Sequence, residues 1–341
     1  MRAAELIAPL TFRLTEMPID EPGPGEVQVH VEAVGVCGSD LHAWSEGAVG
    51  STPNVYPMVL GHEPAGTIVK AGAGVSGFTP GDRGALEPAL YCYHCEFCLS
   101  GHHNVCANIR FLSNPHHPGF FREFVNLPVA NFRPIPATVS FEEAALAEPL
   151  AIGIHSAQLT SIRPGETVAV IGAGPIGLVT IAALRAAGAE RVWAVEPLAH
   201  RRELARAIGA DAALEPAEAV AEILHATGQR GVDCAIDCAA GEETTSQAIQ
   251  LARNAGRVAL TGIHSTPFVA MDGSAMRRKE LTIFNVRRSN HETEKAIRLL
   301  EAHPGWFRPL LTHTRDIDHI DEAFTIAGQY RDNVGKMTIR P

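Results

Sequence analysis

The sequence has no excess of positive charge, no charged low-complexity tract and no internal repeat of fixed period. Its 341 residues contain 28 Lys and Arg against 38 Asp and Glu, which gives a net charge of -10. A field of that sign repels nucleic acid and anionic membrane surfaces, so the expected partners are small molecules. The first 17 residues lack the uninterrupted apolar run of a secretory signal, and we therefore expect a cytoplasmic protein.

One apolar stretch has the length of a membrane helix. Residues 167–184 carry no formal charge over 18 positions, which meets the threshold for a span. Gly172, Gly174, Pro175 and Gly177 interrupt the stretch after a few residues. This punctuation predicts a buried strand, a tight turn and the start of a helix, and no membrane span.

The length of the chain favours two domains over one hydrophobic core. The first 150 or so residues are rich in Gly, Pro and short alternating runs such as Val27 to Ala33, which predict half-buried strands. From about Gly165, apolar runs alternate with Ala-rich helical stretches, the pattern of a doubly wound α/β sheet. The strand candidates of this part are residues 168–171, 192–195, 232–236 and 258–260. A helix at 293–302 and a strand at 336–339 then predict that the end of the chain returns to the first domain.

A Gly-rich motif follows the first of these strand candidates. Gly172, Gly174 and Gly177 form G-x-G-x-x-G, with Pro175 and Ile176 inside it, and an apolar helix pattern follows. In such a motif the first Gly permits the turn, the second lets the backbone approach a pyrophosphate, and the third lets the helix pack on the strand. The alternative is a Gly-rich turn without a ligand.

A carboxylate at the end of the second strand supports the dinucleotide interpretation. Glu196 lies 22 residues after Gly174, where it can accept hydrogen bonds from the adenosine ribose. Glu196 would repel a 2′-phosphate, which favours NAD over NADP. Arg201 and Arg202 follow closely, and either could bind the cofactor or belong to a solvated helix face.

Seven cysteines are present, and four of them lie within fifteen positions in the spacing C-x2-C-x2-C-x7-C. Four thiolates in so short a loop can surround Zn²⁺ and leave no position open, which defines a structural site. An iron–sulfur cluster or unliganded thiols are the alternatives. The four residues are Cys92, Cys95, Cys98 and Cys106.

A second set of possible zinc ligands is dispersed. Cys37 stands in Gly-Val-Cys-Gly-Ser-Asp-Leu-His, His62 and Glu63 follow a Gly, and Glu148 precedes Pro149. Each residue alone is ordinary, because a single Cys is usually a small core residue and Glu-Pro usually marks a turn.

Together these strings resemble the zinc-containing medium-chain dehydrogenases, most closely their sorbitol (polyol) dehydrogenase branch. The resemblance covers nearly the whole chain and includes Gly81-Asp82-Arg83, Leu86-Glu87-Pro88 and the run from Glu148 to His155. It implies a GroES-like β-rich catalytic domain formed by residues 1–151 and 286–341. It also implies a Rossmann domain of residues 152–285, with the active site in the cleft between them.

The resemblance also implies roles for individual residues. Cys37 and His62 would bind catalytic zinc, and Glu63 and Glu148 would ligate it directly or through water, with the choice between them open. Three protein ligands leave one zinc position for the substrate alcohol. Ser39 would take the alcohol proton and His42 would pass it to water.

Other positions bear on the substrate. Asn285 stands where polyol dehydrogenases commonly have arginine, and Ala43 stands where they often have an aromatic residue. Arg287 or Arg288 could hold a carboxylate or phosphate, which would indicate a sugar acid or sugar phosphate. Four aromatic residues are candidates for the pocket wall: Trp44, Phe111, Phe120 and Phe121.

The function expected from these features is zinc-dependent, NAD-linked oxidation of a secondary alcohol, a polyol or another sugar derivative, to the ketone. A threonine-3-dehydrogenase-like enzyme is one alternative, although its pattern prefers Asp-Pro where this chain has Glu148-Pro149. A zinc hydrolase and a non-catalytic dinucleotide-binding protein are others. A homotetramer and a homodimer both fit the resemblance. Histidines of the Cys-rich region lack a metal-binding spacing, and His155 is expected to be structural.

Overall fold

The computed structural model describes all 341 residues and divides into two compact units. Unit 1 consists of Met1–Glu148 and Thr293–Pro341, and unit 2 consists of Pro149–Glu292. The family resemblance implies ends at residues 152 and 285 for the middle segment. Each unit has its own hydrophobic core.

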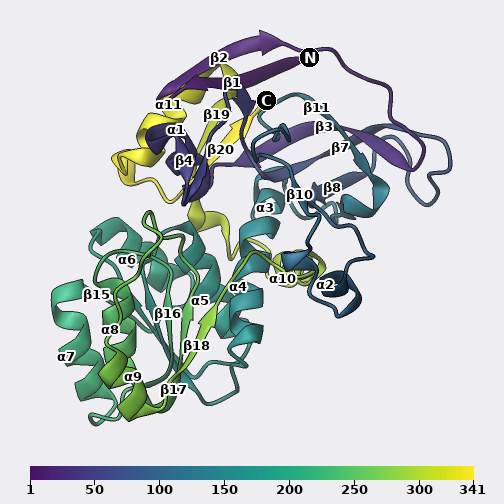
Figure 1. Cartoon of the computed structure of the whole chain (residues 1–341). Coiled ribbons are helices and arrows are strands. Elements are labelled where there is room, and N and C mark those ends of the chain that lie inside the picture. The colour runs from purple at the N-terminus through teal and green to yellow at the C-terminus, as the bar shows by residue number, and fades with distance from the viewer. The chain divides into compact units, whose positions relative to one another are not determined.

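Unit 1 is built on a mainly antiparallel sheet of seven strands in the order β12-β8-β7-β3-β20-β19, with β11 paired to β3 (Figure 1). Small additional sheets pair β2, β1 and β6, β9 with β10, and β4 with β5. The strands are β1 (Arg2–Ala8), β2 (Thr11–Glu16), β3 (Glu26–Gly35), β4 (Ala48–Val49), β5 (Thr52–Pro53), β6 (Met58–Val59), β7 (Glu63–Ala71), β8 (Arg83–Leu86), β9 (Ala89–Leu90), β10 (Arg110–Phe111), β11 (Phe124–Pro128), β12 (Phe132–Pro134), β19 (Leu311–Asp316) and β20 (Lys336–Arg340).

Strand β3 is the centre of this sheet. It pairs with β7, β11 and β20, and Val27, Val29 and Val31 are fully buried. The predicted strand near the end of the chain is confirmed as β20, where Ile339 lies opposite Val34 of β3. The sheet of unit 1 is therefore completed by the last residues of the chain.

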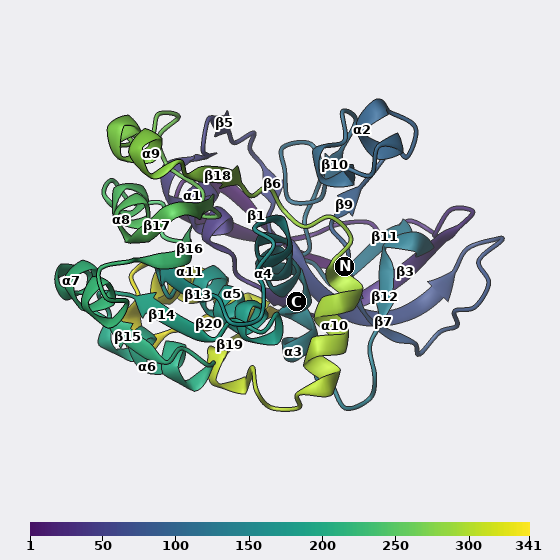
Figure 2. The same ribbon diagram turned by 90° about the horizontal axis from the view of Figure 1, so that it is seen from below.

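Five helices belong wholly to unit 1. They are α1 (Gly38–Glu46), α2 (Glu96–Leu99), α3 (Phe141–Ala145), α10 (Thr293–Ala302) and α11 (Ile320–Gly328). Ser140 caps α3 reciprocally with Glu143, because each side chain accepts a bond from the other's main-chain N–H. Helix α10, which has the predicted bounds, packs beside α3, as the view from below shows (Figure 2). Helix α4 (Ala147–Leu159) begins in unit 1 and continues into unit 2.

Unit 2 is a six-stranded parallel sheet in the order β15-β14-β13-β16-β17-β18. Since parallel crossovers are right-handed, this order places α5 and α6 on one face and α7 and α8 on the other (Figure 1). The elements are β13 (Thr167–Ile171), α5 (Pro175–Ala186), β14 (Arg191–Val195), α6 (Ala199–Ala207), β15 (Ala212–Leu214), α7 (Pro216–Ala226), β16 (Val232–Asp237), α8 (Thr244–Leu251), β17 (Ala252–Leu260), α9 (Gly273–Lys279) and β18 (Thr282–Asn285).

This arrangement confirms the predicted fold class, a GroES-like β-rich part with a Rossmann-type doubly wound sheet. The uncharged stretch from residue 167 contains strand β13 and most of helix α5, as the Gly and Pro punctuation predicted. No helix of the structure has the length and apolar character needed to cross a membrane.

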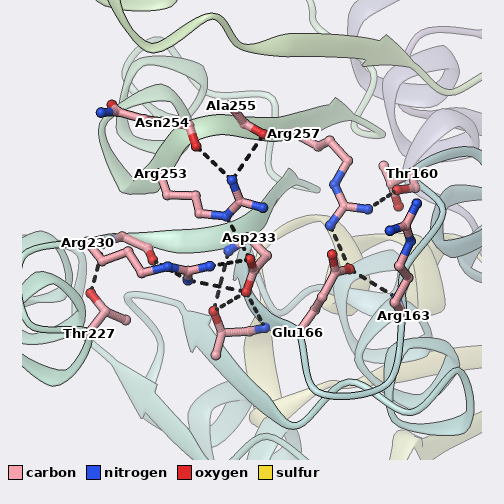
Figure 3. Close-up of polar contacts among 12 residues, drawn as sticks. Thr160, Arg163, Glu166, Thr227, Arg230, Asp233, Arg253, Asn254, Ala255 and Arg257 are labelled. Atoms are coloured by element: carbon pink, nitrogen blue, oxygen red, sulfur yellow. Dashed lines mark hydrogen bonds and ion pairs between the residues drawn. The ribbon is translucent and has the colours of Figure 1, made fainter.

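A buried carboxylate holds together the amino ends of two central strands of unit 2. Asp233 of β16 accepts hydrogen bonds from the main-chain N–H and the hydroxyl of Thr167 at the start of β13. Arg230 and Arg253 form ion pairs with it at 2.6 and 2.7 Å (Figure 3). Burial alone would raise the pKa of Asp233, but the bonds from Arg230, Thr167 and Arg253 hold it well below its ordinary value.

We expect Asp233→Asn to lower the free energy of unfolding by about 2–3 kcal/mol, because two guanidinium groups then lose their buried anion. Because the pKa of Asp233 is lowered in the folded protein, its carboxylate stabilises the fold at pH values above the ordinary pKa of 3.8. That stabilisation disappears as the pH falls below this value towards the folded-state pKa. The free energy of unfolding of the unsubstituted protein should therefore exceed that of Asp233→Asn by more at pH 7 than at pH 3, as measured by denaturant unfolding. Glu218→Gln, an exposed change in unit 2, is the control, and equal unfolding of all three proteins would contradict the expectation.

Candidate metal and dinucleotide sites

The four clustered cysteines meet in the segment from β9 to η1 (His103–Val105). The Sγ atoms of Cys92 and Cys106 lie 3.5 Å apart, those of Cys95 and Cys106 3.9 Å, and those of Cys92 and Cys98 4.0 Å. All four sulfur atoms lie within 4.8 Å of one another, and none forms a disulfide. Zn–S bonds of about 2.3 Å in a tetrahedron place sulfur atoms about 3.8 Å apart. The spacing of the sulfur atoms therefore fits a closed zinc site.

The charges of these thiols also favour a bound cation. Hydrogen bonding by the main chain of His94 lowers the pKa of Cys92 to about 5, whereas burial raises the pKa of Cys98 to about 12. Without a cation the group cannot hold four thiolates, because neighbouring negative charges repel. A dication removes this conflict and brings all four sulfur atoms into the ligand state.

The dispersed ligands come together in unit 1. Cys37 precedes α1 as its N-cap, His62 precedes β7, and Glu63 begins β7. The Cys37 sulfur, a His62 ring nitrogen and a Glu63 carboxylate oxygen all lie within 4.8 Å of one another. His62 and Glu63 are almost completely buried, so this set is a prepared donor cluster. The mixed sulfur, nitrogen and oxygen donors suit Zn²⁺, with fewer protein ligands than the closed site.

Asp40 fixes the orientation of His62, a role that the sequence analysis missed. Its Oδ1 lies 3.3 Å from His62 Nδ1, and its carboxylate also accepts bonds from the main-chain N–H groups of Cys37 and Gly61. Burial would raise the pKa of Asp40, but His62 and these N–H groups hold it below its ordinary value. The anionic carboxylate thus directs the other nitrogen, Nε2, towards the donor cluster, an arrangement typical of metal-binding histidines. The position of Asp40 three residues after Cys37 was the feature of the sequence that could have indicated this role.

Lys336 is the second residue that sequence reasoning missed. Its ammonium is buried, forms an ion pair with Glu63 and donates to the carbonyl of Val36 at 2.9 Å. Burial opposes its charge, yet the Glu63 carboxylate and the Cys37 thiol raise the pKa of Lys336 above its ordinary value. The Glu63 carboxylate therefore contacts both the donor cluster and the permanent positive charge of Lys336.

Glu148 lies near the donor cluster but outside the group of three. It is buried in the first turn of α4, and its Oε2 has no hydrogen-bond partner. Burial raises the pKa of Glu148 to about 8, and the Glu63 and Glu87 carboxylates add to the shift. A buried carboxylate without a partner is costly, so its oxygen fits a position that a metal or a metal-held water would satisfy.

The two proposed proton-transfer residues lie one turn apart on α1. Ser39 Oγ is 3.5 Å from His62 Nε2, so the hydroxyl adjoins the donor cluster. His42 is partly exposed, and its Nδ1 lies 2.8 Å from Glu46. The structure thus places one of these groups beside the cluster and the other near solvent.

The Gly-rich turn has the geometry that the motif predicted. Gly172 has a φ of 91°, a region that favours Gly, and a Cβ on Gly177 would collide with the Gly172 carbonyl. Gly174 is the N-cap of α5 and Pro175 and Ile176 are its first two residues, so the helix N-terminus opens next to the turn. This arrangement presents main-chain N–H groups to an anion.

Glu196 is connected directly to this turn. Its Oε2 accepts from Ala173 N at 2.8 Å, and its Oε1 accepts from Leu198 N at 3.0 Å. Arg201 Nη1 lies 3.7 Å from the position of a Cβ on Gly174, and the residue is only 9% exposed. Arg201 is therefore part of the turn's surroundings and does not lie on a solvated helix face.

The expected substrate residues have different environments. Phe111 is close to the donor cluster, since its ring centroid lies 5.5 Å from that of His62. Trp44 is buried in the core of unit 1 against Phe324. Phe120 and Phe121 are fully buried in the same core. The place of these three side chains in a pocket wall stays a prediction.

The other residues named from the sequence add no ligand to either group of possible metal ligands. Asn285 ends β18 and Arg287 follows it, and both are exposed in unit 2. His155 lies 3.4 Å from Glu292, which agrees with a structural role. The loop histidines belong to neither group of possible ligands: His94, His102, His103, His116 and His117.

Family models match both parts of the chain. Residues 23–137 match the alcohol dehydrogenase GroES-like domain, and residues 175–302 match the zinc-binding dehydrogenase model. Sorbitol dehydrogenase of Bacillus subtilis (strain 168) is 33% identical over 345 residues, covering 100% of this chain and 97% of that protein.

Two solved structures with bound cofactors are similar over the whole chain. An alcohol dehydrogenase from Escherichia coli CFT073, complexed with NADH, has a TM-score of 0.91 and 30% identity, covering 100% of this chain and 99% of that one. A zinc-binding dehydrogenase from Sinorhizobium meliloti 1021, bound to NADP, has a TM-score of 0.90 and 31% identity with the same coverage. The two structures differ in their dinucleotide.

We expect chelator to remove the metal of the Cys37 cluster before that of the four cysteines, because a closed set of four thiolates releases metal more slowly than an open site. Zinc content during dialysis should fall in two steps, from about two ions per chain to about one. The Cys98→Ser variant should show no slow step of zinc loss and should unfold at a lower temperature. Loss of both metals in one step from the unsubstituted protein would contradict this expectation.

We expect Asp40→Asn to weaken zinc binding at the Cys37 cluster by about 10- to 100-fold, because His62 loses the anion that orients its ring. Competition with a chromophoric chelator measures the affinity of the more weakly held zinc. Glu322→Gln, an exposed change in unit 1, should leave this affinity unchanged. Equal affinities of the Asp40 variant and the unsubstituted protein would show that Asp40 does not support the ligand.

Proposed function

Because this chain belongs to the zinc-containing medium-chain dehydrogenases, in their sorbitol dehydrogenase-like branch, we propose that it oxidises the secondary alcohol of a polyol with NAD as acceptor. Its class is that of a zinc-type polyol or alcohol dehydrogenase, an oxidoreductase acting on CH–OH. The observation that carries the proposal is the joining of Cys37 with the buried His62 and Glu63 in one cluster beside Ser39.

We assign the catalytic metal to Cys37 and His62, with one carboxylate from Glu63 or Glu148. When bound, Zn²⁺ supplies Lewis acidity that favours loss of the alcohol proton, and the nicotinamide accepts the hydride. Asp40 holds the His62 ring in place, and the ion pair with Lys336 partly neutralises the Glu63 carboxylate. The unpartnered Glu148 oxygen supports an exchange in which the two glutamates ligate in different states.

The proton leaves through Ser39 in this proposal. Its hydroxyl adjoins the donor cluster and can accept the proton of an alcohol oxygen placed there while it releases its own proton towards solvent. His42 lies one turn further along α1 in a partly exposed position, paired with Glu46, where it can exchange a proton with water. Phe111 supplies an apolar wall beside His62.

The sequence favours a polyol over a simple alcohol, since Glu148-Pro149 follows the polyol pattern. Asn285, in place of the usual arginine, distinguishes the preferred substrate from sorbitol itself, and Arg287 would select an acidic group if the substrate carries one. A homo-oligomer is part of the proposal. Strand β18 ends its sheet, so its outer edge can pair with a second copy.

NAD is preferred in this proposal because Glu196 would lie next to the adenosine ribose. Both carboxylate oxygens accept bonds from main-chain N–H groups, which keeps the anion in place. Its charge favours ribose hydroxyl groups and opposes a 2′-phosphate. Arg201 lies beside the turn that would receive the pyrophosphate.

We expect the purified protein to reduce NAD with a polyol, and a chelator to abolish the reaction. Absorbance of reduced nicotinamide measures turnover across polyols, sugar acids, sugar phosphates, threonine and simple secondary alcohols, each with NAD and NADP. Ser39→Ala should lower kcat by about 10²- to 10⁴-fold while zinc content stays unchanged, since it removes a proton acceptor. Turnover of threonine alone would favour a threonine dehydrogenase, and absence of turnover by the zinc-loaded protein would favour a dinucleotide-binding protein.

A further inference from the structure

Arg202 has an unusual position for a cation near the cofactor turn. It lies on α6, six residues after Glu196, and its side chain is only 15% exposed. Nη1 donates to the carbonyl of Glu196 at 2.9 Å and to that of Pro197 at 2.7 Å, and Nη2 donates to Glu215 Oε1 at 2.7 Å. One guanidinium thus joins the end of β14 to the residue that follows β15.

These bonds fix the main chain that carries the ribose-binding carboxylate. The N–H of Glu196 already donates to Leu214 of β15, and its side chain accepts from Ala173 and Leu198. Arg202 adds the two successive carbonyls, those of Glu196 and Pro197. The position of the Glu196 carboxylate is therefore set by contacts on both its main chain and its side chain.

Glu215 holds Arg202 in this arrangement. It is the N-cap residue of α7, but its side chain makes no cap bond and instead forms an ion pair with Arg202. Its side chain is 56% exposed, and replacing it leaves the core intact. Without the Glu215 charge, the guanidinium keeps only two neutral acceptors, which bind a cation more weakly than a carboxylate does.

A 2′-phosphate at the Glu196 position would compete for the same guanidinium, since arginine is the preferred side chain for bidentate phosphate binding. We propose that the Arg202–Glu215 pair adds to the preference for NAD that the Glu196 charge imposes, because it keeps Arg202 from binding a 2′-phosphate. With Glu215 present, Arg202 supports the Glu196 loop and the site takes NAD. With Glu215 replaced, Arg202 becomes a ligand for the 2′-phosphate of NADP. This inference rests on the proposed preference for NAD.

The test compares binding of NADH and NADPH to the zinc-loaded protein by nicotinamide fluorescence, together with kcat/KM for NAD and NADP. Glu215→Gln should tighten NADPH binding about five- to tenfold, less than a full charge-assisted hydrogen bond provides because Glu196 still opposes the phosphate, and change NADH binding less than about twofold. Glu218→Gln removes the same charge three residues away on α7 and should leave both affinities unchanged. A general electrostatic effect would instead appear in both variants.

A second substitution identifies the group responsible. Arg202→Gln combined with Glu215→Gln should return NADPH affinity to that of the unsubstituted protein, because the phosphate ligand is gone. Persistence of the gain, or equal changes in NADH and NADPH binding by Glu215→Gln, would overturn the inference. A preference of the unsubstituted protein for NADP would instead overturn the proposed cofactor, so the two failures are distinguishable.

Discussion

Burial of negative charge beside Cys37 is the constraint on which the architecture of unit 1 depends. Asp40, Glu63 and Glu148 are all almost completely buried close to one thiol and one imidazole. Only Lys336 offers a permanent positive charge within this group. Carboxylates that stay ionised in such a place require cations, because desolvation of an unpaired charge costs more than the fold can supply, whereas the raised pKa of Glu148 lets that group stay protonated in the absence of a cation. A divalent metal and a lysine together meet this requirement, and the sheet around β3 brings their ligands into one place.

The parts of the site that could be predicted are those whose geometry is local. The spacing of Cys92, Cys95, Cys98 and Cys106 fixes a closed cluster, because a short loop can bring four sulfur atoms together in few ways. The G-x-G-x-x-G spacing likewise predicts the steric roles of Gly172, which has a positive φ, and of Gly177, where a Cβ would collide with the Gly172 carbonyl. Strand and helix candidates of unit 2 agreed with the structure because buried parallel strands are continuous apolar runs.

The parts that could not be predicted depend on distant packing. Lys336 meets Glu63 only because β20 pairs with β3, and nothing in the sequence around Lys336 indicates a buried ion pair. The contact of Trp44 with Phe324 of α11 likewise depends on packing between distant parts of the chain, which the sequence around Trp44 does not indicate. Glu215 and Arg202 are also unremarkable in sequence, and their relation depends on the adjacency of β14 and β15.

The pairing of β20 with β3 also has a consequence for how the protein is made. Ribosomes synthesise unit 2 before Thr293–Pro341, so its sheet can form while unit 1 still lacks β19 and β20. During that interval Glu63 has no lysine partner, and the nascent metal cluster carries an uncompensated anion. Pairing of Glu63 with Lys336 therefore follows the synthesis of β20, which comes after all of unit 2.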